Sequence, residues 1–275
     1  LPYLVRRLLE NGANSSFVNR FMDAKVTVSE LAADPFEIVT NFRTKRHAGI
    51  AKPADLYGDR KNSRGDDLTN PHGSDALIHA LAKEATVTHK AAAIVAGQDC
   101  GAESHDVTSP INGEVIGSAK YVGADDIERA IATAYEAQPA WNELGGNKRA
   151  DTLDRLGDLI EEHRIPLFDL MIREAGKNTE DCISEVREAA DFCRYYALQA
   201  RKNFAEPMVL KGPTGERNEL SLHGRGVFFC IAPWNFPLAI FTGQFAAALG
   251  AGNAVRAKPA EQTPLVAAYA VRLAH

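Results

Sequence analysis

Apolar and polar positions lie on opposite sides of a helical pattern near the N-terminus. Polar residues recur there at i, i+3, i+4 and i+7, and leucine and valine side chains occupy the positions between them. The polar stripe comprises Tyr3, Arg6, Arg7 and Glu10. An Asn-Gly pair at residues 11–12 follows as a stop signal. The pattern predicts a helix with one polar stripe, and a second short helix at residues 17–22.

The next segments alternate between predicted regular structure and predicted loop. Residues 43–67 are dense in charged side chains that glycines and a proline separate, which predicts a linker or a solvated extension. Residues 77–96 are rich in alanine and predict a helix. Residues 107–111 and 115–118 have β character on either side of an Asn-Gly-Glu turn. They predict a hairpin.

Four helices are predicted between residues 125 and 200. Asp125 is placed to cap the first, whose apolar face is formed by isoleucines and alanines at 127–134. Leucines mark the second and third helices. The fourth begins near Thr179 and keeps one long apolar stripe. The stripe comprises Ile183, Val186, Ala190, Cys193, Ala197 and Ala200.

The character of the chain changes at residues 226–255, which contain no charged side chain. Length alone would allow a membrane span, but two prolines interrupt the segment and polar amides lie within it. Apolar runs at 227–231, 238–249 and 254–257 instead predict strand, helix and strand. Such a βαβ unit implies a parallel sheet that is buried on both faces.

Composition narrows the function classes. The 275 residues, 45% hydrophobic and 24% charged, exclude a wholly disordered or collagen-like chain. A net charge of −5 gives no overall attraction to nucleic acid or an anionic membrane. Four scattered cysteines exclude a disulfide framework and a zinc cluster and favour a reducing, cytoplasmic setting. Cys230 lies inside a predicted strand, a position that favours a small core residue over a nucleophile.

Polar side chains follow both strands of the predicted βαβ unit. The loop at residues 233–237 follows the first strand, at the end where α/β sheets bind ligands. Lys258 and Glu261 follow the second strand, where such groups can hydrogen-bond sugar hydroxyls. A rigid packed turn and a solvated loop are the alternatives for these two segments. Gly250 and Gly252 follow a helix and precede a strand, the reverse of a dinucleotide fingerprint, and so predict a helix C-terminus.

These segments together resemble a known family. The Pro-Trp-Asn-Phe-Pro loop and the Lys-Pro-Ala-Glu-Gln-Thr-Pro run from Lys258, both within residues 230–265, resemble the cofactor-binding half of the aldehyde dehydrogenases. The hairpin and four helices extend the resemblance to residues 95–275. The resemblance implies that the amide of Asn235 donates to the oxyanion formed when a thiolate attacks the aldehyde, and that Phe236 lines the aldehyde tunnel.

The same resemblance implies an NAD site. It places Lys258 and Glu261 on the adenosine ribose hydroxyls, and a glutamate there favours NAD over NADP because its charge repels a 2′-phosphate. The residues that it places beside the nicotinamide half are Ile231, Ala232, Pro233 and Trp234. The family's nucleophilic cysteine and general-base glutamate have no match in these 275 residues.

The N-terminal stripe gives a second resemblance. Residues 3–14 resemble the last barrel helix of the flavin-dependent proline dehydrogenases, which implies FAD bound in a (β/α)₈ barrel. Arg6 and Arg7 would hold the carboxylate of proline through charge-assisted hydrogen bonds, with Tyr3 on the same stripe. A solvated helix face is the alternative that the residues themselves leave open.

The two resemblances, in this order, predict an α/β protein of a bifunctional family that oxidises proline with FAD and glutamate semialdehyde with NAD. Residues 1–23 would be the tail of the barrel, 24–94 a linker, and 95–275 the first part of an NAD-binding domain with the start of a Rossmann-like parallel sheet. We expect an interior fragment, inactive by itself, of a cytoplasmic homo-oligomer with no nucleic-acid contacts in this segment. Peripheral membrane association of the full-length protein is left open.

Two other functions compete with this interpretation. One is a monofunctional pyrroline-5-carboxylate dehydrogenase with an unrelated N-terminal extension, against which the stripe with Arg6 and Arg7 argues. The other is a non-catalytic helical interaction module, which the long helix from Thr179 and the missing nucleophile motif favour.

Overall fold

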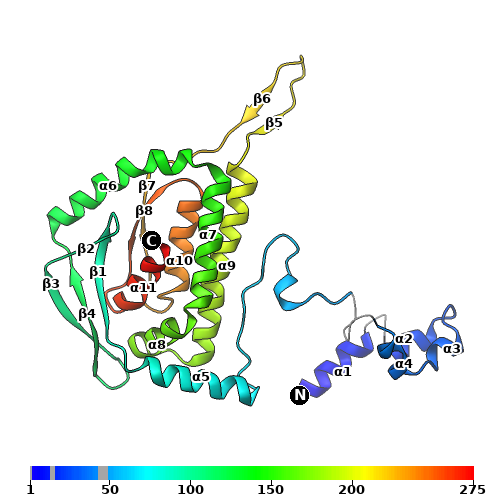
Figure 1. Ribbon diagram of the computed structural model, residues 1–275. Helices are drawn as coiled ribbons and strands as arrows, with labels where there is room; N and C mark the ends of the chain where they lie inside the picture. Colours follow the sequence, from blue (N-terminus) through cyan, green and yellow to red (C-terminus); the bar gives the residue numbers. More distant parts are fainter. Residues whose placement is uncertain (1, 13–15, 43–48) are drawn as a thin grey trace. The chain divides into compact units, whose positions relative to one another are not determined.

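The computed structural model describes residues 2–12, 16–42 and 49–275 (Figure 1). It divides the chain into two compact units, Leu1–Lys52 and Pro53–His275. Predictions that fall on residues 13–15 or 43–48, or on the side chain of Glu10, lie outside the described residues. The predicted domain boundaries, at 23/24 and 94/95, differ from this division and stay predictions.

The first unit consists of short helices with exposed apolar side chains. Both helices predicted near the N-terminus are confirmed. Ser16, Thr27 and Asp34 cap the later helices, because each side chain accepts a backbone N–H of the first turn. The helices are α1 (Pro2–Gly12), α2 (Phe17–Met22), α3 (Val28–Leu31) and α4 (Pro35–Thr40). Whether α1 closes a barrel stays a prediction.

The second unit begins with a short 3₁₀ turn, a helix and a four-stranded sheet. These elements are η1 (Pro53–Asp55), α5 (Pro71–Glu84), β1 (His89–Val95), β2 (Gln98–Cys100), β3 (Glu103–Thr108) and β4 (Val115–Tyr121). The strand order is β2-β1-β4-β3, with β1 parallel to β4. Strands β3 and β4 are antiparallel neighbours, which confirms the predicted hairpin.

The helix predicted over residues 77–96 is wrong beyond Glu84. Residues 89–95 form a strand because β2 and β4 supply backbone partners on both of its edges. Ala96 and Gly97 both have positive φ, the backbone of a tight type I′ hairpin turn between β1 and β2. Alanine does not strongly disfavour an extended backbone. When neighbouring strands on both sides supply hydrogen-bond partners, the tertiary pairing decides that this segment is a strand.

Four helices follow, as predicted. They are α6 (Ala124–Glu143), α7 (Gly145–Glu162), α8 (Arg164–Ala175) and α9 (Thr179–Phe204). Every residue of the predicted α9 stripe is buried, and α9 packs along α7. Asp125 is not the cap of α6, since Gly123 holds that position without a side-chain hydrogen bond. Asp125 instead lies in the first turn, where its charge favours the helix dipole. Ile127 and Ile131 of α6 are exposed.

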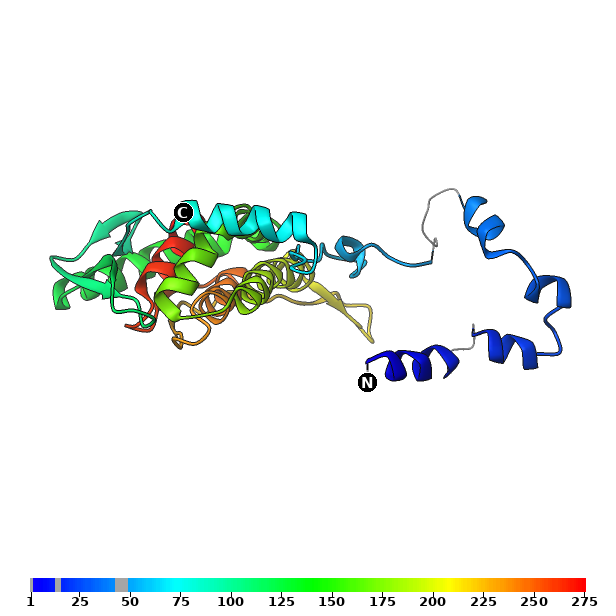
Figure 2. The ribbon, with the colours of Figure 1, turned by 90° about the horizontal axis from the view of Figure 1, so that it is seen from below.

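A hairpin that the sequence did not predict separates α9 from the final elements. It consists of β5 (Met208–Leu210) and β6 (Asn218–Leu220), which pair antiparallel. In both views it projects past the end of α9, away from the helices of its unit (Figures 1 and 2). Its apolar side chains, including Val209 and Leu210, are exposed.

The predicted βαβ unit is confirmed. It consists of β7 (Val227–Ile231), α10 (Ala239–Gly250) and β8 (Ala254–Lys258), and α11 (Pro264–Ala274) follows. Strands β7 and β8 are parallel, and α10 packs on them and on α9. The expectation that both sheet faces are buried is wrong, because Phe229 and Ile231 of β7 are about 60% exposed. Among the described helices, none combines the length and apolarity needed to cross a membrane.

Residues 59–67, which we call the strap, are docked on α7 and α9. Asp191 of α9 accepts hydrogen bonds from the backbone N–H and the hydroxyl of Ser63, at 3.0 and 2.9 Å. Lys61 pairs with Asp158 of α7 at 3.2 Å, and Arg60 with Asp191 at 3.3 Å. Ser63 is buried. The solvated-linker interpretation is therefore wrong for the strap, whose charges match carboxylates on two helices far away in sequence.

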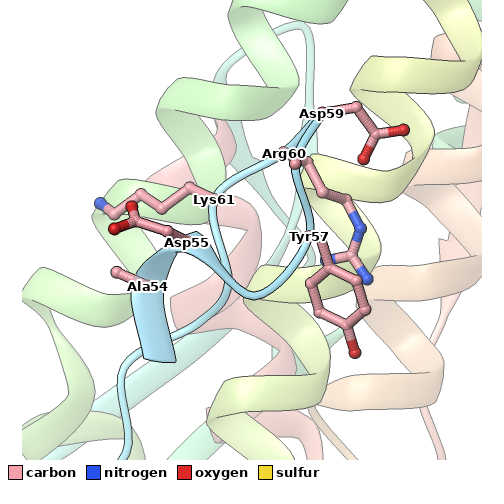
Figure 3. A pocket seen from close by; sticks show the side chains of 7 residues that line it. Ala54, Asp55, Tyr57, Asp59, Arg60 and Lys61 are labelled. Carbon is pink, nitrogen blue, oxygen red and sulfur yellow. The ribbon is translucent and has the colours of Figure 1, made fainter. Parts of the chain in front are cut away.

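Two cavities lie along the strap. Figure 3 shows the first, of about 370 Å³, where the guanidinium of Arg60 stacks on the ring of Tyr57 at 3.9 Å. Lys61 points to the opposite side of this segment from Arg60 (Figure 3). The second, of about 410 Å³, lies between the strap, α7 and α9 and mixes carboxylates with Arg194 and Arg201. Neither cavity includes a residue of the loop at 233–237.

Candidate active site

The ends of the two parallel strands bring the predicted cofactor segments together. Ile231 at the end of β7 lies opposite Lys258 at the end of β8. The backbone N–H of Ala232 donates to the carbonyl of Lys258 at 3.1 Å, so the segments that follow both strands begin side by side. This is the carboxyl edge of a parallel pair, where ligands bind in α/β sheets.

The loop after β7 has a buried frame and exposed side chains. Ala232 and Pro237 are buried, whereas Trp234, Asn235 and Phe236 are exposed. The amide of Asn235 is therefore presented to solvent at the strand end. That exposure fits a group that meets a substrate better than one that merely fills a packed turn.

Lys177 contacts this loop from a distant part of the sequence. Its ammonium donates to the backbone carbonyl of Asn235 at 2.9 Å and lies 4.7 Å from the centre of the Phe236 ring. It also pairs with the carboxylate of Glu185 at 2.7 Å. The sequence analysis missed Lys177 and Glu185. The Gly-Lys dipeptide after α8 is a recognisable helix end, but nothing local connects it to a loop some sixty residues on.

Two buried glutamates cap the helices that follow β7 and β8. One oxygen of Glu185 accepts the backbone N–H groups of Leu238 and Ala239, at 2.8 and 3.1 Å, at the start of α10. Glu174 accepts those of Leu265 and Val266, at 2.6 and 2.9 Å, at the start of α11. Neither helix has a side-chain cap of its own. The two carboxylates from α8 and α9 therefore satisfy N–H groups that would otherwise be buried without partners.

Lys258 and Glu261 form an exposed ion pair at the end of β8, with the ammonium and carboxylate 3.3 Å apart. A hydrogen bond from the backbone N–H of Glu261 itself is the largest cause that lowers the pKa of Glu261, and Lys258 is the next. The carboxylate therefore stays ionised. An ionised, accessible carboxylate accepts hydroxyl hydrogen bonds and repels a phosphate. The pair can therefore accept hydroxyl hydrogen bonds, and its predicted role in binding NAD stays a prediction.

The glycine turn between α10 and β8 is a helix end, as predicted. Helix α10 ends at Gly250, and its last carbonyls receive side-chain donors. Arg149 donates to the carbonyl of Gly250 at 3.2 Å, and Trp141 to that of Leu249 at 2.9 Å. Burial lowers the pKa of Arg149. The turn lies at the amino ends of β7 and β8, the opposite edge of the strand pair from the candidate site. Its carbonyl acceptors are already occupied, whereas a phosphate-binding loop presents N–H donors.

The cysteines do not form a nucleophilic centre. All four are free, and burial raises the pKa of both Cys182 and Cys193 to about 12. Burial also raises the pKa of Cys230, which agrees with a core role. A thiol held neutral is a poor nucleophile. Within the described ranges, histidine, cysteine and carboxylate side chains do not gather in a group that would hold a metal ion.

The second candidate site lies in the first unit. Tyr3, Arg6 and Arg7 are exposed on α1. The guanidinium of Arg7 lies 5.7 Å from the centre of the Tyr3 ring, one helical turn away. The stripe thus forms as its spacing predicts, and its role stays a prediction.

Comparison with known proteins gives the class of this chain. The family model for the aldehyde dehydrogenase family matches residues 87–275. The chain belongs to that family, as the loop and strand-end motifs predicted.

Its similarity to one kind of member extends over almost the whole chain. It is 42% identical to the bifunctional protein PutA of Salmonella typhimurium over 99% of its residues, which is 20% of that protein. A crystal structure of a bifunctional proline utilization A (PutA) protein matches all of the chain and 25% of its own length, with 40% identity and a TM-score of 0.80.

A third relative matches a smaller part of the chain. The structure of a 1-pyrroline-5-carboxylate dehydrogenase from Thermus with bound NAD matches 78% of the chain and 42% of its own length, with 29% identity and a TM-score of 0.73. The chain spans about a fifth of the length of the curated PutA relatives it matches.

Proposed function

We propose that the protein to which this chain contributes oxidises proline to pyrroline-5-carboxylate with FAD and then oxidises glutamate semialdehyde to glutamate with NAD. The observation that carries the aldehyde half is that the exposed Asn235 follows β7 and the Lys258–Glu261 pair lies at the end of β8, both at the carboxyl edge of two parallel strands. The names of the PutA relatives support the bifunctional assignment.

In the aldehyde reaction this chain binds the cofactor and stabilises charge. Lys258 and Glu261 would hold the adenosine ribose, while the backbone from Ile231 to Trp234 would flank the nicotinamide. NAD, when bound there, accepts the hydride. Asn235 would donate its amide to the oxygen that becomes anionic as a thiolate adds to the aldehyde, and Phe236 would line the approach to it. This hydrogen bond strengthens as the reaction proceeds, so it favours the transition state.

The test is Asn235→Ala in the full-length protein. Loss of one oxyanion donor typically lowers kcat by about 10²–10³. We expect a fall of that size with glutamate semialdehyde, together with nearly unchanged NAD affinity and melting temperature. A lowered melting temperature with near-normal kcat would show that Asn235 only fixes the turn.

A second variant tests the cofactor assignment. Glu261→Gln removes the charge that repels a 2′-phosphate while it keeps a hydrogen-bonding oxygen. We expect weaker NAD binding and reduced discrimination against NADP. The measurement is kcat/KM with each cofactor, and an unchanged ratio would remove Glu261 from the site.

The proline half rests on α1. Arg6 and Arg7 suit a substrate carboxylate rather than a flavin, so the proposal of FAD rests on the resemblance of residues 3–14 to the flavin-dependent proline dehydrogenases. Replacement of either arginine by Met should raise KM for proline and leave aldehyde oxidation intact. Equal loss of both activities would indicate a folding role instead.

We also propose that the protein is a homo-oligomer. The projecting hairpin of β5 and β6 supports this, because an isolated two-stranded ribbon with exposed apolar side chains gains stability when a partner covers it.

A further inference from the structure

We propose that Lys177 is a positioning residue for aldehyde oxidation, which acts with Glu185 to hold the loop that carries Asn235. The inference rests on the proposed role of Asn235 and goes beyond it, because it names the groups that keep the oxyanion donor in place. Lys177 contacts the main chain and the Phe236 ring of the loop, and so acts through Asn235 rather than on the substrate.

The end of α8 places Lys177. Gly176 adopts a left-handed backbone, with φ +67°, and its N–H donates to the carbonyl of Ile172 at 3.1 Å. The N–H of Lys177 donates to the carbonyl of Met171 at 3.2 Å. This helix ending reverses the chain before α9, and a residue with a Cβ would adopt it only at a cost. These two hydrogen bonds therefore fix the backbone position of Lys177.

The ammonium of Lys177 then joins two parts of the unit. It is held by the carboxylate of Glu185 at 2.7 Å and donates to the carbonyl of Asn235 at 2.9 Å. The Lys177 side chain is only 13% exposed and that of Glu185 only 1%. Because both are largely shielded from water, their attraction is screened less than that of a surface pair.

Glu185 holds the other side of the same loop. Its second oxygen accepts the N–H groups of Leu238 and Ala239, immediately after the loop. Gln244 of α10 donates to the carbonyl of Ile231 at 3.0 Å, immediately before it. The loop is thus restrained at its start, at its centre and at its end. Of these restraints, only the central one acts directly on the residue whose amide is proposed to meet the oxyanion.

Such a restraint has a chemical consequence. An oxyanion donor helps only if its position needs no adjustment as charge develops, and a displacement of about 1 Å can cost about 10² in rate. A lysine bound to the carbonyl of Asn235 fixes the backbone of that residue without occupying its side-chain amide. The side chains assigned to the adenosine ribose of NAD, Lys258 and Glu261, lie at the end of β8 and outside the loop that Lys177 contacts.

The experiment is a double-mutant cycle in the full-length protein. Lys177→Met alone would leave the carboxylate of Glu185 buried without a cation and could prevent folding. The combined variant Lys177→Met, Glu185→Gln removes both charges and keeps an amide oxygen for the start of α10. It is compared in the wild-type background and in Asn235→Ala, and Lys202→Met, an exposed lysine of α9, is the matched control.

We expect the combined variant to lower kcat for glutamate semialdehyde about tenfold in the wild-type background, and less than about twofold in Asn235→Ala, because the oxyanion donor is then already absent. The affinity for NAD should change little. Equal fold-losses in both backgrounds, or no loss of kcat in the wild-type background, would overturn the positioning role. If Asn235→Ala itself leaves kcat unchanged, the proposed function of Asn235 fails first, and the positioning role fails with it.

Discussion

At the scale of single residues, this chain uses buried carboxylates in place of ordinary helix caps. Glu174 and Glu185 reach from one helix to the N-terminus of another, so each cap also ties two elements together. The two differ in their electrostatics. Glu185 has Lys177 as its counterion, whereas Glu174 accepts hydrogen bonds from the backbone N–H groups of Leu265 and Val266.

This difference predicts a pH dependence of stability. Burial raises the pKa of Glu174 from its ordinary value of 4.5 to about 8, and the two backbone donors oppose the shift only in part. Between these values the folded protein binds a proton that the unfolded chain has released. The contribution of Glu174 is therefore fully present below about pH 4.5 and is lost as the pH rises through about 8.

We expect Glu174→Gln to flatten this dependence, because the amide does not titrate. A tenfold difference in proton affinity corresponds to about 1.4 kcal/mol, so the contribution is roughly 5 kcal/mol at most. Thermal unfolding of the full-length protein from about pH 5 to about pH 8.5 measures it. Glu180→Gln, in an exposed position of α9, is the control, and parallel pH profiles for wild type and Glu174→Gln would contradict the prediction.

At the scale of elements, the strap is held in place by residues of α7 and α9 that are far from it in sequence. Its ion pairs are partly exposed, and such pairs contribute about 0–1 kcal/mol each. The stronger term is the burial of Ser63, whose backbone N–H and hydroxyl both bond to Asp191. A buried donor left without a partner costs about 1–3 kcal/mol. The hydrogen bonds from Ser63 to Asp191 therefore contribute more to holding the strap than its ion pairs do.

We expect Asp191→Ala to loosen the strap. Trypsin should then cleave faster after Arg60, Lys61 or Arg64, and amide exchange of the strap should increase, while α7 and α9 stay protected. Asp151→Ala, which removes a carboxylate from an exposed pair with Arg201, is the control. Identical cleavage rates for wild type and Asp191→Ala would show that other contacts hold the strap.

At the scale of the whole molecule, the chain presents apolar surface that its own second unit does not cover. The hairpin of β5 and β6 is the clearest case, since it projects from its unit (Figure 1). Its residues Met208, Val209 and Leu210 are exposed. Large exposed apolar patches mark interaction sites. The proposed occupant is a second copy of the protein.

We expect Val209→Asp to lower the oligomeric state, because a charge on the hairpin would have to be buried in the interface. Light scattering coupled to size-exclusion chromatography of the full-length protein measures it. Val115→Asp, also at an exposed strand position but on β4, is the control. An unchanged mass for Val209→Asp would place the interface elsewhere.

The sequence by itself determined the elements whose pattern is local. The stripe of α9, the two runs of the βαβ unit and the hairpin of β3 and β4 each depend on neighbours within a few residues, so periodicity and turn chemistry were sufficient. The family, and with it the candidate residues at the two strand ends, followed from motifs that are contiguous in sequence.

Only the tertiary structure decided the features that depend on distant partners. Residues 89–95 form a strand because two other strands lie beside them, and the strap docks because carboxylates of α7 and α9 meet it. Lys177, Glu185 and Asn235 have no common local pattern. Their contacts arise when the segment after α8, the second turn of α9 and the loop after β7 are packed together. Side-chain periodicity within one element carries no information about which other element it will face.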